Sequence, residues 1–244
     1  MTETLRIAHC SDIHLDPDSY GGVARNDRQR QAFALALDAM SAHRPDLLLL
    51  AGDLFESNSA GADTIHWAME ALGGLSFPVV MIPGNHDCMD GGAIYRRHDF
   101  NRIPNVRLLA AEAGEVTWLP ELGVAAWGKG MVDHTPDYRP LAGCPTRPEG
   151  CRWWLGLAHG LFVPHGCDTH RSSPIHQVEI ERSDCDYLAL GHHHAALELV
   201  SDKATAAYSG SPTDTVGRGP TYVIVDLSPE RAPVLNVHVV GAAG

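Results

Sequence analysis

Short apolar segments recur along the chain, and polar residues follow directly after them. Residues 79–82 read VVMI and are followed by PGNHD. An apolar, β-branched run bounded by Pro and Gly is typical of a strand buried on both faces. The pattern predicts five such strands, each ending on residue types that bind metals: the run at 79–82 together with Leu5–Cys10, Leu47–Ala51, Trp154–Ala158 and Tyr187–Leu190.

Other segments follow different periods. Apolar residues spaced three or four apart predict helices over Asp27–His43, which Pro45 ends, and over Asp63–Leu72. Met131–Arg152 and Pro164–Pro174 are rich in Pro, Gly and polar residues, which indicates two loops that would form a lid if the substrate is a small phosphoester. Shorter β-like runs predict an antiparallel continuation of the sheet at Val106–Leu109, Glu115–Leu119 and Val124–Trp127, and hairpin strands at Leu197–Val200, Thr205–Tyr208, Tyr222–Asp226 and Val234–Val240.

The polar residues after the five strands are candidate metal ligands. Ligands of open α/β sheets bind beyond the carboxyl ends of the strands, so these side chains are expected to share one crevice. Any one of them alone would more often be an ordinary turn residue, but their joint recurrence favours a metal site. Asp12 and His14 would point to the same side of an extended segment. The full set is Asp12, His14, Asp53, Asn85, His159, His192 and His194, with His193 leaving the choice within the histidine run open.

Composition limits the class of protein. A chain of 244 residues with 44% hydrophobic residues can form one sizeable core, so we expect a single domain over residues 1–244 without a C-terminal capping domain. No apolar run reaches the length of a membrane helix and no leader pattern opens the chain, which predicts a soluble cytoplasmic protein that does not bind membranes. The six scattered cysteines predict no disulfide framework. A formal net charge of -12 disfavours non-specific binding to long nucleic acids.

The order of these motifs resembles that of the calcineurin-like metallophosphoesterases. The matching segments are Asp12-Ile13-His14, Gly52-Asp53, Gly84-Asn85-His86-Asp87, His159-Gly160 and Gly191-His192-His193-His194. Within that superfamily, Ala51–Phe55 and Tyr208–Pro212 are most similar to the SbcD-type exonuclease subunits of double-strand-break repair complexes. The resemblance implies an α/β fold, a four-layer αββα sandwich with mixed sheets and a dinuclear metal site at the carboxyl ends of its strands.

The same resemblance implies roles for individual residues. Asp12, His14, Asp53 and His194 would hold one divalent ion, and Asp53, Asn85, His159 and His192 the other, so that Asp53 bridges the pair. Manganese is the expected metal, with iron or zinc as alternatives. Two such ions would activate water for attack on a phosphoryl group. His86 would bind phosphate and protonate the leaving oxygen, and Asp87 would orient His86.

The sequence leaves the substrate open. Asn85, His86 and the neighbouring Arg96 and Arg97 are candidate substrate contacts, although the two arginines could equally form a solvated face. A phosphodiesterase with nuclease-like activity on DNA is one interpretation. Hydrolysis of a small phosphodiester or phosphomonoester, such as a cyclic nucleotide, is the second, and a non-catalytic interaction module is the third. An ATPase partner is conceivable by resemblance, but its docking segment is not recognised in the sequence.

Overall fold

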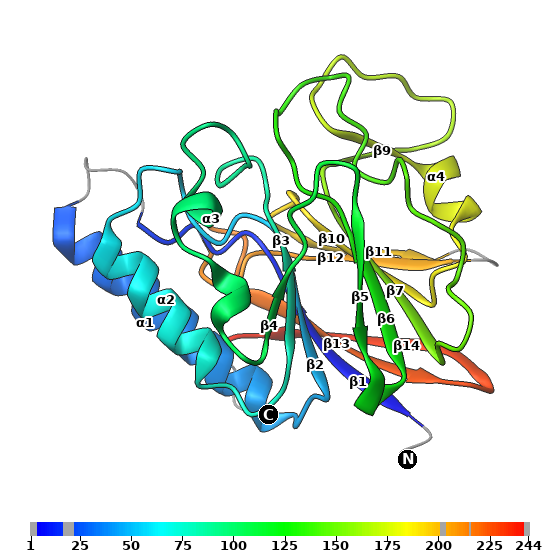
Figure 1. The fold of residues 1–244 in the computed structure, drawn as a ribbon, viewed down its shortest axis with the longest axis horizontal. Coiled ribbons are helices and arrows are strands. Elements are labelled where there is room, and N and C mark those ends of the chain that lie inside the picture. The colour runs from blue at the N-terminus through cyan, green and yellow to red at the C-terminus, as the bar shows by residue number, and fades with distance from the viewer. Residues whose placement is uncertain (1–3, 17–21, 201–203, 215, 242–244) are drawn as a thin grey trace.

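Two six-stranded β-sheets packed face to face form the centre of the protein (Figure 1). The computed structural model describes residues 4–16, 22–200, 204–214 and 216–241, and for residues 22–25 it describes the backbone only. Most of the predicted strands are present, within a few residues of the expected limits.

The first sheet is mixed. Its strands β1, β2, β3 and β4 run parallel to one another, and β13 pairs antiparallel with β1 and with the edge strand β14. Two helices, α1 (Gly22–Ala42) and α2 (Ala62–Gly73), lie against its outer face (Figure 1). In spatial order the strands are β14 (Arg231–Val239), β13 (Thr221–Ser228), β1 (Leu5–Cys10), β2 (Leu47–Ala51), β3 (Val79–Ile82) and β4 (Val106–Leu108).

The second sheet is also mixed. Its outer face carries the short helix α4 (Gln177–Arg182) and loop segments, and a two-stranded sheet of β8 (Leu161–Val163) and β9 (Pro174–His176) lies near it. In spatial order its strands are β11 (Ala196–Val200), β12 (Thr205–Ser209), β10 (Tyr187–Gly191), β7 (Trp153–His159), β6 (Val124–Gly128) and β5 (Glu115–Leu119). The elements not yet placed are helix α3 (Ile94–Arg97) and the 3₁₀ turns Phe100–Arg102 and Pro120–Leu122.

The antiparallel continuation predicted for residues 106–127 is wrong in two respects. Strand β4 pairs parallel with β3 and completes the first sheet, while β5 and β6 belong to the second sheet. Of the three predicted strands, β5 and β6 pair antiparallel with each other, and β6 pairs parallel with β7. The sequence signals each strand but does not show that the chain crosses from one sheet to the other after β4.

Burial on both faces explains the uninterrupted apolar runs. In β2, Leu47 and Leu49 face the layer between the two sheets, whereas Leu48 and Leu50 face the helices. All four side chains are fully buried, and each contributes about 1.5–3 kcal/mol through removal of apolar surface from water. Consecutive residues of one strand therefore hold two different layers together.

The layers are arranged as helices, sheet, sheet and a thin outer layer that contains α4 (Figure 1). This is the predicted α/β class and the predicted four-layer αββα sandwich. Helix α2 matches its predicted range within one residue at each end, and α1 begins five residues earlier than predicted. Among the helices in the described segments, none combines the length and apolar character needed to cross a bilayer.

Candidate metal centre

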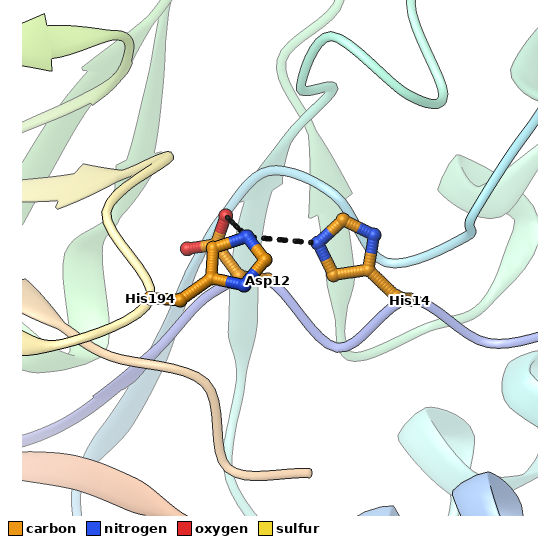
Figure 2. A group of neighbouring side chains, drawn as sticks. All are labelled: Asp12, His14 and His194. Carbon is orange, nitrogen blue, oxygen red and sulfur yellow. Dashed lines mark hydrogen bonds and ion pairs between the residues drawn. The ribbon is translucent and has the colours of Figure 1, made fainter. Parts of the chain in front are cut away.

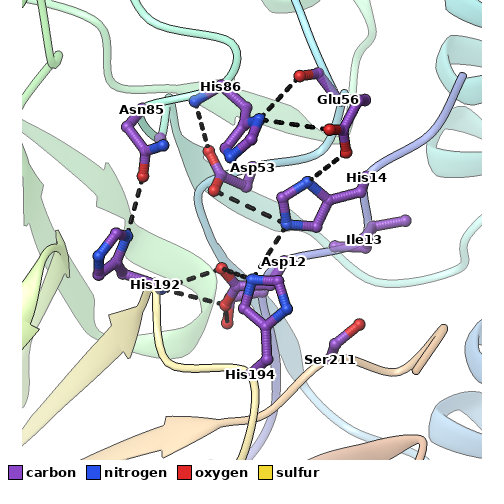
Figure 3. Close-up of polar contacts among 12 residues, drawn as sticks. Asp12, Ile13, His14, Asp53, Glu56, Asn85, His86, His192, His194 and Ser211 are labelled. Atoms are coloured by element: carbon purple, nitrogen blue, oxygen red, sulfur yellow. Dashed lines mark hydrogen bonds and ion pairs between the residues drawn. The ribbon is translucent and has the colours of Figure 1, made fainter. Parts of the chain in front are cut away.

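The predicted ligands meet at one end of the sandwich, where strands from both sheets finish (Figure 3). The first sheet supplies its ligands from the loops after β1, β2 and β3, and the second sheet from the end of β7 and the loop after β10. The crevice thus lies between two sheets rather than at the edge of one. Its residues are Asp12, His14, Asp53 and Asn85 on one side and His159, His192 and His194 on the other.

One group of ligand atoms surrounds the carboxylate of Asp12. His194 Nε2 lies 3.6 Å from Asp12 Oδ1 and 3.3 Å from His14 Nε2. Figure 2 shows the two imidazole rings directed at each other beside this carboxylate. All three residues offer a ligand atom within 4.8 Å of the others, which is close enough for one cation to contact all three.

A second group lies next to the first. Asp53 Oδ2 is 3.2 Å from His159 Nε2, and Asn85 Oδ1 is 3.0 Å from the same nitrogen. His192 Nδ1 approaches Asn85 Oδ1 to 2.9 Å. Asp53 Oδ2 also lies 3.9 Å from His14 Nε2 in the first group. The Asp53 carboxylate therefore stands between the two groups.

Two of the histidines present the nitrogen that a metal requires. His159 Nδ1 lies 2.8 Å from the carbonyl oxygen of Ala51, and His14 Nδ1 lies 2.9 Å from Glu56 Oε2. These oxygens only accept hydrogen bonds, so each contact favours a hydrogen on Nδ1 and directs Nε2 into the cluster, where a bound cation would replace the proton on Nε2. Fixing the imidazole tautomer in this way is the usual function of the groups behind a metal ligand.

Histidines surround the two buried carboxylates of the cluster. In the described part of the chain, the ion-pair partners of Asp12 and Asp53 are histidines alone. Although burial opposes charge on His159, the Asp53 carboxylate raises the pKa of His159 to about 9. Burial, together with the nearby His159, lowers the pKa of His192 to about 3. Imidazole nitrogen with carboxylate and amide oxygen is a donor set that suits divalent transition-metal ions.

The backbone at these ligands departs from the extended conformation expected for Asp12 and His14. Their φ angles are 57° and 54°, and those of Asp53 and His192 are 53° and 100°. Strand β1 ends at Cys10, so the two ligands reach the crevice from a left-handed turn. Residues with a side chain rarely adopt such angles, and each costs on the order of 1 kcal/mol. Strain of this kind is typical of functional sites.

Two glycines allow the loops to approach so closely. A Cβ atom on Gly84 would overlap the carboxylate of Asp53, and one on Gly191 would overlap the carbonyl oxygen of Ala51. A larger residue at Gly84 would push the loop after β3 away from the loop after β2, and one at Gly191 would push the second sheet away from the first.

His86 lies at the rim of the cluster. Its backbone N–H donates to Asp53 Oδ1 at 2.9 Å, and its Nδ1 lies 2.8 Å from the carbonyl oxygen of Glu56. The imidazole packs edge-on against that of His14, with 4.7 Å between the ring centroids, and the side chain is 38% exposed (Figure 3). His86 is therefore accessible to a substrate while its orientation is fixed from behind.

Glu56 also contacts the cluster, although it was not among the candidates predicted from the sequence. Its carboxylate pairs with His14 at 2.9 Å and lies 3.7 Å from His86 Nδ1. The sequence feature that could have identified Glu56 is its position, three residues after Asp53 in the same loop.

The prediction that Asp87 orients the ring of His86 is wrong, because the carboxylate bonds elsewhere. Asp87 accepts hydrogen bonds from the N–H of Gly84 at 2.7 Å and of Leu54 at 2.9 Å, and from the hydroxyl of Tyr95 at 2.6 Å. The side chain is fully buried, and this burial raises its pKa. Asp87 thus joins the loops after β2 and β3, while the Glu56 carbonyl takes the position expected for Asp87.

The two candidate arginines and the middle histidine of the 192–194 run all lie away from the ligand atoms. Arg96 and Arg97 lie exposed at the end of α3, where their guanidinium groups donate to the carbonyl oxygens of Met89 and Asn58. His193 turns away from the cluster, because its Nδ1 lies 2.8 Å from the carbonyl oxygen of Ala195. The structure brings His192 and His194 to the cluster and leaves the two arginines outside it.

A cluster of imidazoles and carboxylates at the strand ends of an αββα sandwich defines the class of metal-dependent phosphoesterases. The chain belongs to the calcineurin-like phosphoesterase family, whose sequence model matches residues 5–196. The family depends on a dinuclear metal centre, and the ligand atoms gathered in this crevice are candidates for one.

Two relatives with similar sequences carry names that describe different activities. The chain is 25% identical over 221 residues to the DNA double-strand break repair protein Mre11 of Saccharolobus solfataricus, an alignment that covers 85% of this chain and 54% of the relative. It is 35% identical over 101 residues to a probable cyclic nucleotide phosphodiesterase of Pseudoalteromonas, covering 38% of this chain and 37% of the relative. The chain thus spans about half of the first of these relatives and less of the second.

Solved structures confirm the fold. A Thermus thermophilus protein superposes with a TM-score of 0.63 at 12% sequence identity, covering 97% of this chain and 99% of the other. An archaeal phosphodiesterase gives a TM-score of 0.54 at 12% identity, covering 96% and 99% of the two chains.

Proposed function

We propose that the protein is a metal-dependent hydrolase of phosphodiester bonds. The observation that carries this proposal is the position of the Asp53 carboxylate, which faces His14 in one group of ligands and His159 in the other. A carboxylate with one ligand group on each side is suited to bridge two cations. Two divalent ions held there would activate water and offset the negative charge of the phosphoryl group.

Each ion would take four of the residues that converge at the site. Asp12, His14, Asp53 and His194 hold the first, and Asp53, Asn85, His159 and His192 hold the second. Manganese is the proposed metal, and iron and zinc are the alternatives that the mixed nitrogen and oxygen donors also accept.

His86 is the proposed general acid. The Glu56 carbonyl accepts from Nδ1, so Nδ1 carries a hydrogen and Nε2 is the nitrogen left to hold the proton that the leaving oxygen needs. Asp87 supports this step only by fixing the loop from which His86 projects. Arg96 and Arg97, on the exposed end of α3, are proposed as outer contacts for a long substrate.

The proposed substrate class follows from what the two relatives share. One is named for repair of DNA and the other for hydrolysis of cyclic nucleotides, and the linkage in both substrates is a phosphodiester. DNA is one candidate substrate, and a cyclic nucleotide or another small phosphoester is the second. A non-catalytic interaction module is disfavoured because the ligands and His86 lie together in one site.

Hydrolysis by the manganese-loaded protein tests the proposal. The substrates are bis-p-nitrophenyl phosphate, p-nitrophenyl phosphate, a cyclic nucleotide and short single-stranded DNA, with the Asp53→Ala variant as the control for contaminating enzymes. We expect cleavage of the diester to exceed that of the monoester. Failure to cleave any of the four with manganese, iron or zinc would refute the proposed function.

A further inference from the structure

A third histidine borders the metal centre from a different direction. His134 lies in the loop between β6 and β7, and its imidazole packs edge-on against that of His192 with 5.7 Å between the ring centroids. The rings of His192 and His159 are in contact in the same manner, at 5.3 Å. His134 is thus on the His159 and His192 side of the cluster, whereas His86 packs on His14 on the other side.

The imidazole of His134 carries a polar atom without a partner. Its Nε2 is buried, and within the described residues no group hydrogen-bonds to it. Buried polar side-chain atoms nearly always have a hydrogen-bond partner, since leaving one unpaired costs free energy.

The loop around His134 is fixed at both sides of the residue. Three residues earlier, the carbonyl oxygen of Met131 accepts from the N–H of Met89 at 2.6 Å, and the Met131 side chain is buried. One residue later, the carbonyl oxygen of Thr135 accepts from the N–H of Ser173 at 3.0 Å. The loop is therefore tied to the segment after His86 and to the segment before β9, with His134 between the two hydrogen bonds.

We propose that His134 is a substrate-contacting residue whose Nε2–H donates a hydrogen bond to a phosphoryl oxygen. This inference rests on the proposed function, because it assigns the hydrogen bond to the phosphoester bound at the same centre. With His86 on the opposite side, the phosphoryl group would be held between two imidazoles. The metal ligands themselves are unchanged by the assignment.

Variants of His134 separate hydrogen bonding from packing. His134→Phe keeps an aromatic ring against His192 and removes the nitrogen, while His134→Gln keeps an N–H donor. The matched control is His170→Ala, which removes an exposed histidine from the neighbouring loop. Binding of inorganic phosphate to the manganese-loaded proteins is measured by calorimetry, and bound manganese by elemental analysis.

We expect His134→Phe to weaken phosphate binding roughly 10- to 100-fold with two manganese ions retained, as for loss of a hydrogen bond to a charged group. His134→Gln should recover part of the affinity and His170→Ala should match the wild type. Unchanged phosphate binding in His134→Phe, loss of manganese from it, or no phosphate binding by the wild type would overturn the inference. If the wild type binds phosphate but hydrolyses no ester, the proposed function fails while the role of His134 is still decided by the binding data.

Discussion

Glu56 provides a sharp test of how the metal centre is held. Its carboxylate lies 2.9 Å from His14 Nδ1, on the side of the ring away from His194 and Asp53. A carboxylate at this position favours a hydrogen on Nδ1, which would leave Nε2 to bind a cation. Removing the carboxylate makes the other tautomer accessible, and in that tautomer Nε2 carries the hydrogen and cannot be a ligand.

The expected loss can be estimated from the exposure of the group. Carboxylates behind a metal-bound histidine typically contribute 10- to 100-fold in metal affinity, or about 1.4–2.7 kcal/mol. The Glu56 side chain is 29% exposed, so water screens part of its charge. We therefore expect Glu56→Gln, which keeps an acceptor, to weaken manganese binding by about 10-fold, and Glu56→Leu to weaken it by about 30- to 100-fold.

Calorimetric titration of the metal-free protein with manganese measures these affinities, and circular dichroism confirms that each variant is folded. Only the ion held by His14 should be affected, so the titration of Glu56→Leu should separate into one unchanged and one weakened step. The reasoning is refuted if Glu56→Leu binds both ions as tightly as the wild type, or if both steps weaken equally.

Three further predictions concern other residues. Asp53→Ala should lose both manganese ions in elemental analysis after dialysis, because the carboxylate faces both ligand groups; retention of two ions would exclude a bridging role. His86→Ala should lower kcat by about 10²- to 10⁴-fold with metal content near normal, as for removal of a general acid; metal loss would show that His86 is a ligand instead. Burial lowers the pKa of His9 to about 3, so its neutral form is favoured in the folded state and stability is lost as pH falls below about 6.5. Between pH 7 and pH 5 this loss is about 2 kcal/mol. The variant His9→Gln keeps a partner for the Tyr187 hydroxyl. Its free energy of unfolding, measured with urea, should therefore change less between these pH values, by about 2 kcal/mol. Equal pH dependence of the two proteins would mean that His9 is not buried in its neutral form.

The residues at the strand ends were predictable because their spacing is local. Each strand is a short apolar run, and each ligand follows within a few residues, so the sequence contains both the element and the polar group at its end. The family resemblance then supplied the grouping of ligands around Asp53. The structure brings these residues to one crevice, and their assignment to two ions remains a proposal.

Contacts between distant segments could not be predicted in the same way. Whether Asp87 faces His86 or the backbone of Leu54 depends on how the loops after β2 and β3 pack, and no local pattern records that packing. The positive φ angles at Asp12 and His14 were missed for a related reason, since they depend on hydrogen bonds from these residues to the loop that contains Asp53. The crossing from the first sheet to the second also depends on long-range pairing.

The division of the ligands between two sheets has a consequence for the stability of the whole sandwich. Cations bound there would link the two sheets, since the Asp53 carboxylate of the first sheet lies next to the His159 ring of the second sheet. Separation of the two sheets would then require release of the ions. A ligand that binds only the native state stabilises it by about 2.7 kcal/mol when the free ligand concentration is a hundred times the dissociation constant. Chelation should therefore loosen the contact between the sheets far from the centre, and amide exchange in β2 and β7 would report it.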